Sequence, residues 1–162
     1  MLQIRQAQKS DIRDLVDLDD ECFDTYYYKK TKFNELDFQD YLSFSKSILQ
    51  VAVHDCGPVG YVAGRVRTSA NSVEPTSAAR SIAHLDSIAV RLVARRKGIG
   101  SQLLHVFIQE AKKRECMMVV LEVATANKEG LRFFSKHGFL KNRDLPRDYG
   151  RCLDGVSMRL SI

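Results

Sequence analysis

The sequence predicts one domain of mixed α/β class, with a central mixed sheet of about seven strands flanked by about four helices. The chain has 162 residues, which is the length of one ordinary domain. Segments of helical periodicity alternate along it with short apolar runs rich in β-branched residues. The composition, 44% hydrophobic and 28% charged with only 3 prolines, is typical of a folded globular protein. We therefore expect residues 1–162 to form a single domain.

The first third of the chain predicts a strand followed by two helices. Residues 2–7 form a short strand-like run. Ser10 with Asp11 marks the start of a helix that runs to about residue 23, because these side chains commonly cap helix N-termini. A second stretch of helical character covers residues 35–47.

The next segment predicts an antiparallel hairpin. Two apolar, β-branched runs, residues 48–54 and 59–66, flank the turn residues 55–58. Residues 68–80, rich in Ser and Ala, have no periodicity and predict a mobile loop. Residues 82–90 follow as another strand.

A parallel crossover is expected in the second half. After the strand at 82–90 comes a glycine turn, then an amphipathic helix from Gly100, then a nearly continuous apolar strand at 117–123. An apolar run of this kind is typical of a strand covered on both faces with parallel neighbours. The order strand, helix, strand therefore predicts a right-handed crossover. The apolar face of the helix consists of Leu103, Leu104, Phe107, Ile108 and Ala111.

The C-terminal part predicts a short helix and two strands. Asn127 is a suitable N-cap, Glu129 favours the first turn, and Gly138 can take the left-handed conformation that ends a helix. The helix is expected at about 128–137. The strands are expected at 139–143 and 153–160.

The charge of the chain favours an anionic ligand. Basic residues exceed acidic ones by 25 to 20, a formal net charge of +5. We expect the basic clusters to gather around the glycine turn. No basic helix or interleaved aromatic platform is visible, so nucleic acid is not an expected partner. The clusters are Arg91, Arg95, Arg96 and Lys97 before the turn, and Lys112, Lys113 and Arg114 after the following segment.

Several other classes of protein lose support. No apolar run approaches the roughly 20 residues of a membrane span, and no secretory signal is visible, so we expect a cytoplasmic protein without a membrane partner. Cysteines and histidines are scattered rather than paired at metal-ligand spacing, so no metal site is expected. We expect a monomer or a homodimer. The cysteines are Cys22, Cys56, Cys116 and Cys152.

The glycine turn is the main candidate binding site. In Arg95-Arg96-Lys97-Gly98-Ile99-Gly100-Ser101 a strand gives way to a helix, so backbone N–H groups converge at the positive end of the helix. The flanking cations can neutralise a pyrophosphate. The pattern lacks the lysine of a P-loop, and Leu103 occupies the third glycine position of a dinucleotide fold. Nucleotide hydrolysis and hydride transfer therefore lose support.

These residues resemble the GNAT superfamily of N-acetyltransferases. Arg95-x-x-Gly98-x-Gly100 is similar to the (Gln/Arg)-x-x-Gly-x-(Gly/Ala) acetyl-coenzyme A motif of that family. The resemblance extends to the opening Ile4-Arg5-x-Ala7-x-x-x-Asp11-Ile12 and covers nearly all of the chain. Further matching residues are Ile88-Ala89-Val90 before the turn, and Asn127, Phe133, Phe134, Gly138 and Phe139 after it.

Within the superfamily the chain looks most like ribosomal-protein alanine and other protein N-terminal acetyltransferases. The resembling residues are Leu121-Glu122-Val123 followed by Asn127, then Tyr149, then Asp154-Gly155-Val156-Ser157-Met158. The resemblance implies an enzyme that transfers an acetyl group from acetyl-CoA to a protein N-terminal α-amine by direct attack. A small-molecule amine acetyltransferase and a non-catalytic acyl-CoA-binding module remain alternatives.

The resemblance also implies where acetyl-CoA binds. The fourth and fifth strands, at about 82–90 and 117–123, are expected to splay apart. Pantetheine would pair with the exposed edge of the fourth strand. The residues implied for pantetheine are Ile88, Ala89 and Val90; for pyrophosphate Arg95, Arg96, Lys97, Gly98, Ile99, Gly100 and Ser101; and elsewhere along the cofactor Asn127 and Phe134.

Two residues are implied in catalysis. Glu122 is a lone carboxylate in an apolar strand, where related alanine acetyltransferases carry theirs, and could take the amine proton through water. Asp86, on the opposing strand, is the second candidate, and the alternative for Glu122 is a side chain that reaches solvent or pairs with an arginine. Many relatives have a tyrosine acid where this chain has Phe134, so Tyr149 could substitute or contact the substrate backbone.

Overall fold

The computed structural model describes residues 1–23, 32–55, 57–68, 81–149 and 153–162, with residues 148 and 149 described by their backbone alone. The fold is of mixed α/β class with a seven-stranded sheet, as predicted. The helices are α1 (Ile12–Cys22), α2 (Glu35–Ser43), α3 (Ile99–Lys113) and α4 (Lys128–Lys136), with 3₁₀ turns η1 (Lys9–Asp11) and η2 (Leu92–Ala94). The strands are β1 (Gln3–Gln6), β2 (Ser47–His54), β3 (Gly57–Thr68), β4 (Ser81–Val90), β5 (Cys116–Ala124), β6 (Leu140–Tyr149) and β7 (Leu153–Ser161).

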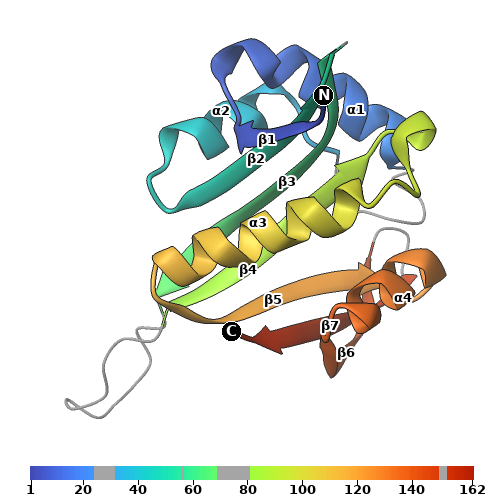
Figure 1. Cartoon of the computed structure of the whole chain (residues 1–162). Coiled ribbons are helices and arrows are strands. Elements are labelled where there is room, and N and C mark those ends of the chain that lie inside the picture. The colour runs from blue at the N-terminus through green and yellow to red at the C-terminus, as the bar shows by residue number, and fades with distance from the viewer. Residues whose placement is uncertain (24–31, 56, 69–80, 150–152) are drawn as a thin grey trace.

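The sheet has the order β1-β2-β3-β4-β5-β7-β6. Strands β1 to β4 are antiparallel to their neighbours, and β5, β7 and β6 form a second antiparallel group. The two groups meet at the parallel pair β4 and β5, which α3 connects (Figure 1). The predicted hairpin and the predicted parallel crossover are therefore both confirmed.

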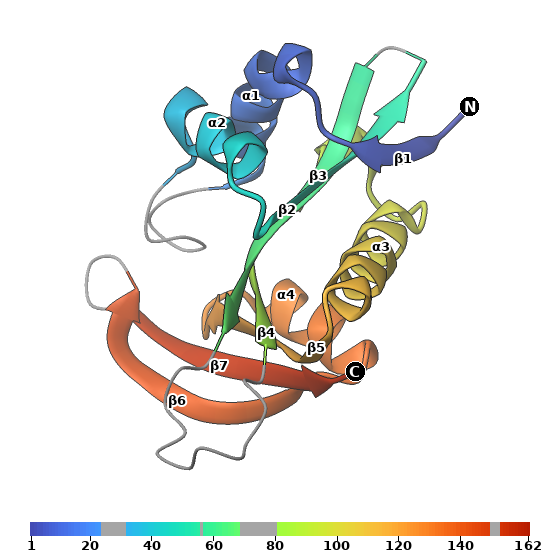
Figure 2. The same cartoon turned by 90° about the vertical axis from the view of Figure 1, so that its left-hand side faces the viewer.

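Two hydrophobic cores cover opposite faces of the sheet. Helix α3 packs on one face, and α1 and α2 pack on the other (Figure 2). The apolar stripe predicted for α3 is buried, with Leu103, Leu104 and Phe107 fully enclosed. Position 64 of β3 has no room for a side chain, because a Cβ atom there would lie 2.6 Å from the Phe107 ring. The helix thus lies directly against the backbone of β3.

The first helix begins differently from the prediction that Ser10 caps it. Ser10 lies inside η1, and α1 starts only at Ile12. The carboxylate of Asp11 accepts hydrogen bonds from the backbone N–H of Gln8 at 2.7 Å and from the Arg5 guanidinium at 2.7 and 2.9 Å. These bonds lower the pKa of Asp11 below its usual value.

Replacing Asp11 by asparagine is expected to lower the free energy of unfolding at pH 7 by about 1–3 kcal/mol, because the bonds to a charged acceptor are lost. A depressed carboxyl pKa stabilises the fold above the unfolded-state pKa, and this stabilisation is lost as the pH falls through the folded-state pKa. The difference from wild type should therefore shrink between about pH 5 and pH 2. Urea unfolding at pH 7 and pH 3 tests this, with the exposed Asp14→Asn as control. An equal difference at both pH values would contradict it.

Helix α2 is shorter than the predicted 35–47. It begins as expected, with the Asn34 side chain accepting bonds from the N–H groups of Leu36 and Asp37. It ends at Ser43 because Phe44 takes an extended conformation and Ser47 pairs with Arg65 as the first residue of β2. A turn at residues 44–46 and the start of β2 at Ser47 thus take the four residues that were predicted to continue the helix.

Strand β6 is longer than the predicted 139–143 and reaches Tyr149 through Pro146. Proline is tolerated because β6 is the edge strand, where its missing N–H leaves no partner unsatisfied. The register shifts between Leu145 and Tyr149, and Arg147 there has a φ of +54°. Thr68, the first residue of the predicted loop at 68–80, belongs to β3, and the rest of that segment lies outside the described residues. No helix among the described residues is long and apolar enough to cross a membrane.

Candidate active site

The predicted gap between the fourth and fifth strands is present. Pairing of β4 with β5 ends at Leu85 opposite Leu121, although β4 continues to Val90 and β5 to Ala124. Beyond that point each strand keeps its other neighbour, β3 for β4 and β7 for β5, and the two diverge (Figure 1). The facing edges of β4 and β5 therefore present backbone polar groups that no strand of the described residues pairs.

A β-bulge in β4 coincides with the gap. Ser87 pairs with Ala63 and Leu85 pairs with Gly64, so Asp86 is an extra residue relative to β3. A bulge bends its strand and increases the local twist. The bend falls one residue after the last pair with β5, and we attribute the divergence of the two strands to it.

The residues implied for pantetheine lie in the open segment of β4. The side chain of Ala89 is buried in the core below α1 and α2, and that of Val90 is buried in the core below α3. Ile88 packs against the α3 core. These side chains anchor the strand on both faces and leave its edge open. The carbonyl of Val90 accepts bonds from Arg95 Nε at 2.9 Å and from Cys22 Sγ at 3.3 Å.

The glycine turn has the geometry expected of an anion site. Gly98 is the residue before α3 and has a φ of +77°, in the left-handed region that favours glycine. A Cβ atom on Gly98 would meet nothing within 4 Å, so the turn faces open space. Gly98 is the N-cap of α3 and has no side chain with which to cap the helix. Its first N–H groups are therefore available to an anion.

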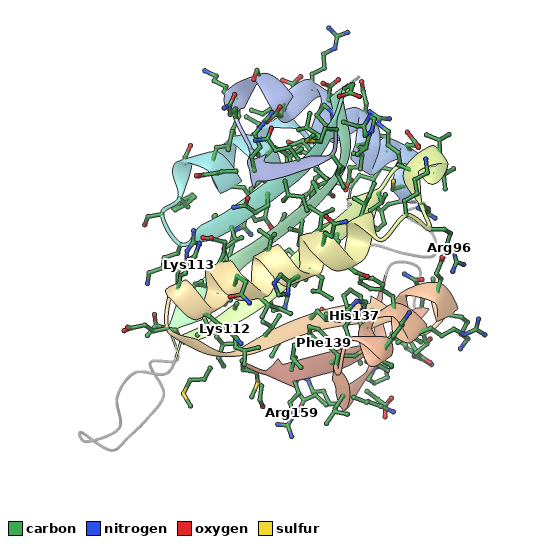
Figure 3. The ribbon with its side chains drawn as sticks, viewed as in Figure 1. Arg96, Lys112, Lys113, His137, Phe139 and Arg159 are labelled. Carbon is green, nitrogen blue, oxygen red and sulfur yellow. The ribbon has the colours of Figure 1, made fainter. Side chains whose placement is uncertain are left out.

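The basic residues do not all gather at the turn, which corrects that expectation. Arg95, Arg96 and Lys97 lie at the N-terminal end of α3, whereas Lys112 and Lys113 lie at the other end of the helix (Figure 3). The 15 residues of α3 separate the two groups by about 20 Å. Only the first group can act on a ligand at the turn.

Helix α4 packs against the turn through residues that the sequence analysis did not assign. His137 Nε2 lies 3.0 Å from Ser101 Oγ, and a Cβ atom on Gly100 would lie 3.6 Å from the Phe133 ring. Phe133 and His137 are one helical turn apart, and their rings are 4.5 Å apart between centroids. The i, i+4 spacing of two aromatic side chains was the available signal for this face.

Glu129 in the first turn of α4 forms ion pairs with the turn. Its carboxylate lies 3.3 Å from Arg96 and 4.0 Å from Arg95. Arg96 has a φ of +62°. The two ion pairs therefore link the basic turn to the first turn of α4.

Asn127 and Phe134 have structural roles in α4. Asn127 Oδ1 accepts the backbone N–H of Gly130 at 2.8 Å, which confirms it as the N-cap. A Cβ atom on Gly130 would lie 2.7 Å from Asn127 Nδ2, so a larger residue would displace the cap. Phe134 is buried and packs edge-to-face against Phe133 and Phe139. Contact of Asn127 and Phe134 with a cofactor remains a prediction, and Gly138, with a φ of +86°, ends the helix as expected.

Glu122 lies on β5 just beyond the last pair with β4. Leu121 and Val123 point into the core below α3, so the alternation along the strand directs Glu122 to the opposite face. The side chain is half-buried, and its strand neighbour on β7 is Ser157. A carboxylate at this position can face a substrate that enters from the side of α1 and α2.

Asp86 is engaged by neighbouring side chains. Its carboxylate accepts the Tyr41 hydroxyl at 2.6 Å and lies 2.7 Å from His84 Nδ1. Burial raises the pKa of Asp86, but the bonds from His84 and Tyr41 and the charge of Arg65 outweigh it, so that the pKa lies below its usual value. An acid of lowered pKa with both oxygens occupied is a weak proton acceptor at neutral pH. This argues against Asp86 as the base.

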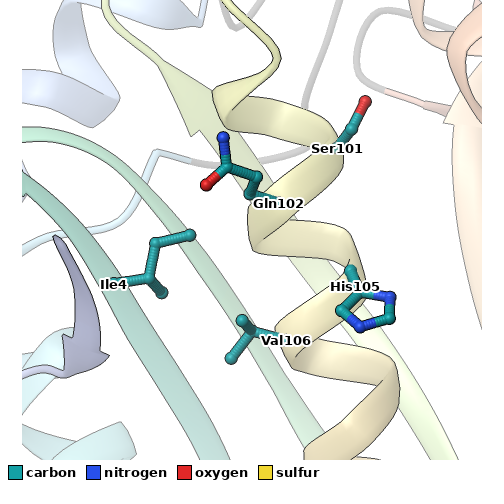
Figure 4. Close-up of a pocket in the computed structure, with 5 residues that line it drawn as sticks. All are labelled: Ile4, Ser101, Gln102, His105 and Val106. Atoms are coloured by element: carbon teal, nitrogen blue, oxygen red, sulfur yellow. The ribbon is translucent and has the colours of Figure 1, made fainter. Parts of the chain in front are cut away.

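Two further features complete the region. Tyr149 pairs with Leu153 through the backbone of the β6–β7 hairpin, and its side chain lies outside the described part of the structure. A hollow of about 410 Å³ lies beside α3, where Gln102 and Val106 face Ile4 of β1 (Figure 4). Its lining contains no carboxylate, lysine or arginine, so nothing ties it to the acid–base groups. Among the described residues no three His, Cys, Asp or Glu side chains cluster as metal ligands.

The fold and the site together define a class of protein: one that can hold a diphosphate-bearing ligand at a basic turn and extend it along an open strand edge toward a carboxylate. Residues 12–139 match the sequence model of the acetyltransferase (GNAT) family. The chain belongs to this family. The resemblance found in its motifs is thus confirmed.

Comparison with individual proteins agrees with the family. The chain is 32% identical over 139 residues to an uncharacterized N-acetyltransferase of Methanocaldococcus jannaschii, covering 84% of this chain and 59% of that relative. Arabidopsis thaliana NAA60, solved with acetyl-CoA, has a TM-score of 0.87 at 17% identity, covering 100% of this chain and 99% of that one. The ribosomal-protein-S18-alanine N-acetyltransferase of Escherichia coli has a TM-score of 0.78 at 18% identity, covering 100% and 94% of the two chains. The chain therefore spans less than two thirds of the first relative, and the structural matches establish its fold.

Proposed function

We propose that this chain is an N-acetyltransferase that uses acetyl-CoA and acts on a protein N-terminal α-amine. The observation that carries the proposal is the open edge of β4 beyond Leu85, which leads from the glycine turn to Glu122. Two structures of the same fold support it, one solved with acetyl-CoA and one named as an alanine N-acetyltransferase.

The residues of the chain fit the parts of acetyl-CoA. The N–H groups at the start of α3, with Arg95, Arg96 and Lys97, would hold the pyrophosphate. The edge of β4 at residues 88–90 would pair with the amides of pantetheine as an added strand would. Acetyl-CoA supplies an acetyl group activated as a thioester. A backbone N–H near Val90 would stabilise negative charge on the thioester oxygen.

Glu122 would accept the amine proton through a water molecule. An attacking amine must be neutral, and an α-amine with a pKa of about 7.7 to 8.0 is partly neutral at pH 7. A lysine amine, with a pKa near 10.4, needs far more assistance. A single carboxylate beside the gap therefore suits an α-amine better than a lysine side chain. Tyr149 would contact the substrate backbone or donate a proton to the leaving thiolate.

A panel of acceptors tests the proposal. Peptides with free N-termini, N-blocked lysine peptides and small amines would each be incubated with the protein and acetyl-CoA, and products identified by mass spectrometry with thiol release as a second readout. Acetylation of free N-termini is expected. Acetylation of small amines alone would replace the proposed substrate class. Binding of acetyl-CoA with no transfer to any acceptor would favour the non-catalytic acyl-CoA-binding module. The observation that favours this alternative is Phe134, which is buried and cannot donate a proton as a tyrosine would.

A further inference from the structure

We infer that the acceptor is a protein whose N-terminal segment carries acidic side chains a few residues after the reacting amine, and that this segment lies across the arginine-bearing face of the sheet. The inference rests on the proposed function and specifies its substrate class. The arginine-bearing face is defined as the side of β3, β4, β5, β7 and β6 that carries Arg65, Arg67, Arg143 and Arg159.

The strand registers place these arginines on one face. Arg65 pairs with His84, His84 with Val120, and Val120 with Arg159, so the four residues form one row across the sheet. The Arg65 guanidinium lies 4.2 Å from the ring centre of Tyr41 in α2, which identifies the face as the one opposite α3. The next row begins with Arg67 opposite Ile82.

The same face carries the catalytic candidates. Glu122 pairs with Ser157, and Ser157 pairs with Arg143, which forms the row immediately beyond the last β4–β5 pair. On the four strands β3, β4, β5 and β7 of this face, the acidic side chains among the described residues are Asp86 and Glu122. Asp86 is already engaged by Tyr41 and His84. The two carboxylates thus lie at the gap itself, and the arginines Arg65, Arg67 and Arg159 lie on the same face farther from it.

These cations are not neutralised within the described part of the chain. Arg67, Arg143 and Arg159 are exposed, and the salt bridges between described residues include none of them. Lys141 and Asp144, by contrast, pair with each other at 2.6 Å beside Arg143. Exposed arginines that remain unpaired along one face are complementary to an anionic partner.

A hollow in this face provides a place for an acidic side chain. It has a volume of about 370 Å³ and lies between the end of α2 and β3. Ser47 also lines this hollow, and its hydroxyl is buried without a hydrogen-bond partner among the described residues. Three cations and one acid surround it. The lining residues are Asp40, Phe44, Lys46, Ser47, Arg65, Val66 and Arg67.

The distance from the gap fixes which substrate positions matter. Arg67 pairs with Ile82, three residues before Leu85 at the edge of the gap, which corresponds to about 10 Å along the strand. An extended peptide covers the same distance in about three residues. With its first residue at the edge of the gap, the peptide would place its fourth residue over Arg67, with residues three and five on either side.

Paired peptides test the inference. One peptide carries Asp or Glu at positions three to five, and its partner carries Asn or Gln there. For the wild-type protein kcat/KM is expected to be about tenfold higher for the acidic peptide at low salt, and the preference should shrink at 0.5 M salt. The double variant Arg67→Gln/Arg159→Gln should lose most of the preference. The control Lys112→Gln/Lys113→Gln removes the same amount of charge from the C-terminal end of α3. It should retain the preference for the acidic peptide.

The possible outcomes separate the two proposals. Equal kcat/KM for both peptides, or an acidic preference that survives in the double variant, would overturn the inference while leaving N-terminal acetylation intact. If neither peptide is acetylated, the proposed function fails. Fluorescence anisotropy of the labelled peptides, measured with wild type and the same variants, still tests whether the arginine-bearing face binds the acidic peptide. Tighter binding of a short single-stranded RNA than of the acidic peptide, lost in the same double variant, would overturn the assignment to an acidic peptide.

Discussion

Replacing Glu122 by glutamine is expected to lower kcat for acetyl transfer by about 10²-fold or more at pH 7, with little change in the affinity for acetyl-CoA. Glutamine has nearly the same shape as glutamate but cannot take a proton from the amine. At pH 9 most α-amines are already neutral, so the loss should shrink to about tenfold or less. The measurements are kcat over this pH range and calorimetry with acetyl-CoA.

The matched control is Glu110→Gln, which makes the same chemical change on α3, where Glu110 pairs with Lys113 at 2.7 Å. This variant should keep wild-type kcat. A loss that is equally large at pH 7 and pH 9 for Glu122→Gln would remove Glu122 as the base. Full activity of Glu122→Gln at pH 7 would favour the His84 and Asp86 pair as the proton acceptor instead.

Replacing Gly98 by valine is expected to weaken acetyl-CoA binding by at least about 100-fold. Gly98 has a φ of +77°, a region that a β-branched residue rarely adopts, so the turn must change shape to accept valine. The new side chain would also enter the open space in front of the turn, where we place the pyrophosphate. Isothermal titration calorimetry with acetyl-CoA measures the effect directly.

Gly57→Val is the control, because Gly57 also has a positive φ, +113°, but is the first residue of β3 and does not belong to the turn at 95–101. It should lower stability while keeping acetyl-CoA affinity in the folded protein. Wild-type affinity of Gly98→Val would refute the assignment of the turn. Gly100 differs from Gly98, because its φ is not positive and a Cβ atom there would make ordinary contacts at 3.6 Å or more.

Local signals were sufficient for much of the fold. The Asn127 cap, the left-handed glycine at 138 and the apolar face of α3 each depend on residues close in sequence, and the structure has all of them. The predicted end of α2 was wrong because Ser47 pairs with Arg65 of β3. Helical periodicity carries no information about such a contact between distant segments. The extent of β6 was missed because Pro146 reads as a loop until the strand is known to be an edge.

The site was predictable where it follows a motif and not where it depends on contacts between distant segments. The turn at 95–101 was recognisable from its glycines and cations. The ion pair of Glu129 with Arg96 joins residues 33 positions apart, and the bond of His137 to Ser101 joins residues 36 apart. Neither has a local sequence signal. The arginine-bearing face likewise depends on the pairing order of β3, β4, β5 and β7.

The extra residue in β4, Asp86, limits which mutations this strand can accept during evolution. His84 and Ser87 are three positions apart and yet point to the same face, because Asp86 shifts the alternation of the strand by one. A deletion of that single codon would restore the regular alternation and leave Ala89 and Val90 on their present faces, but it would remove the bend to which we attribute the gap. The strand can therefore vary its residue types over generations more readily than it can vary its length.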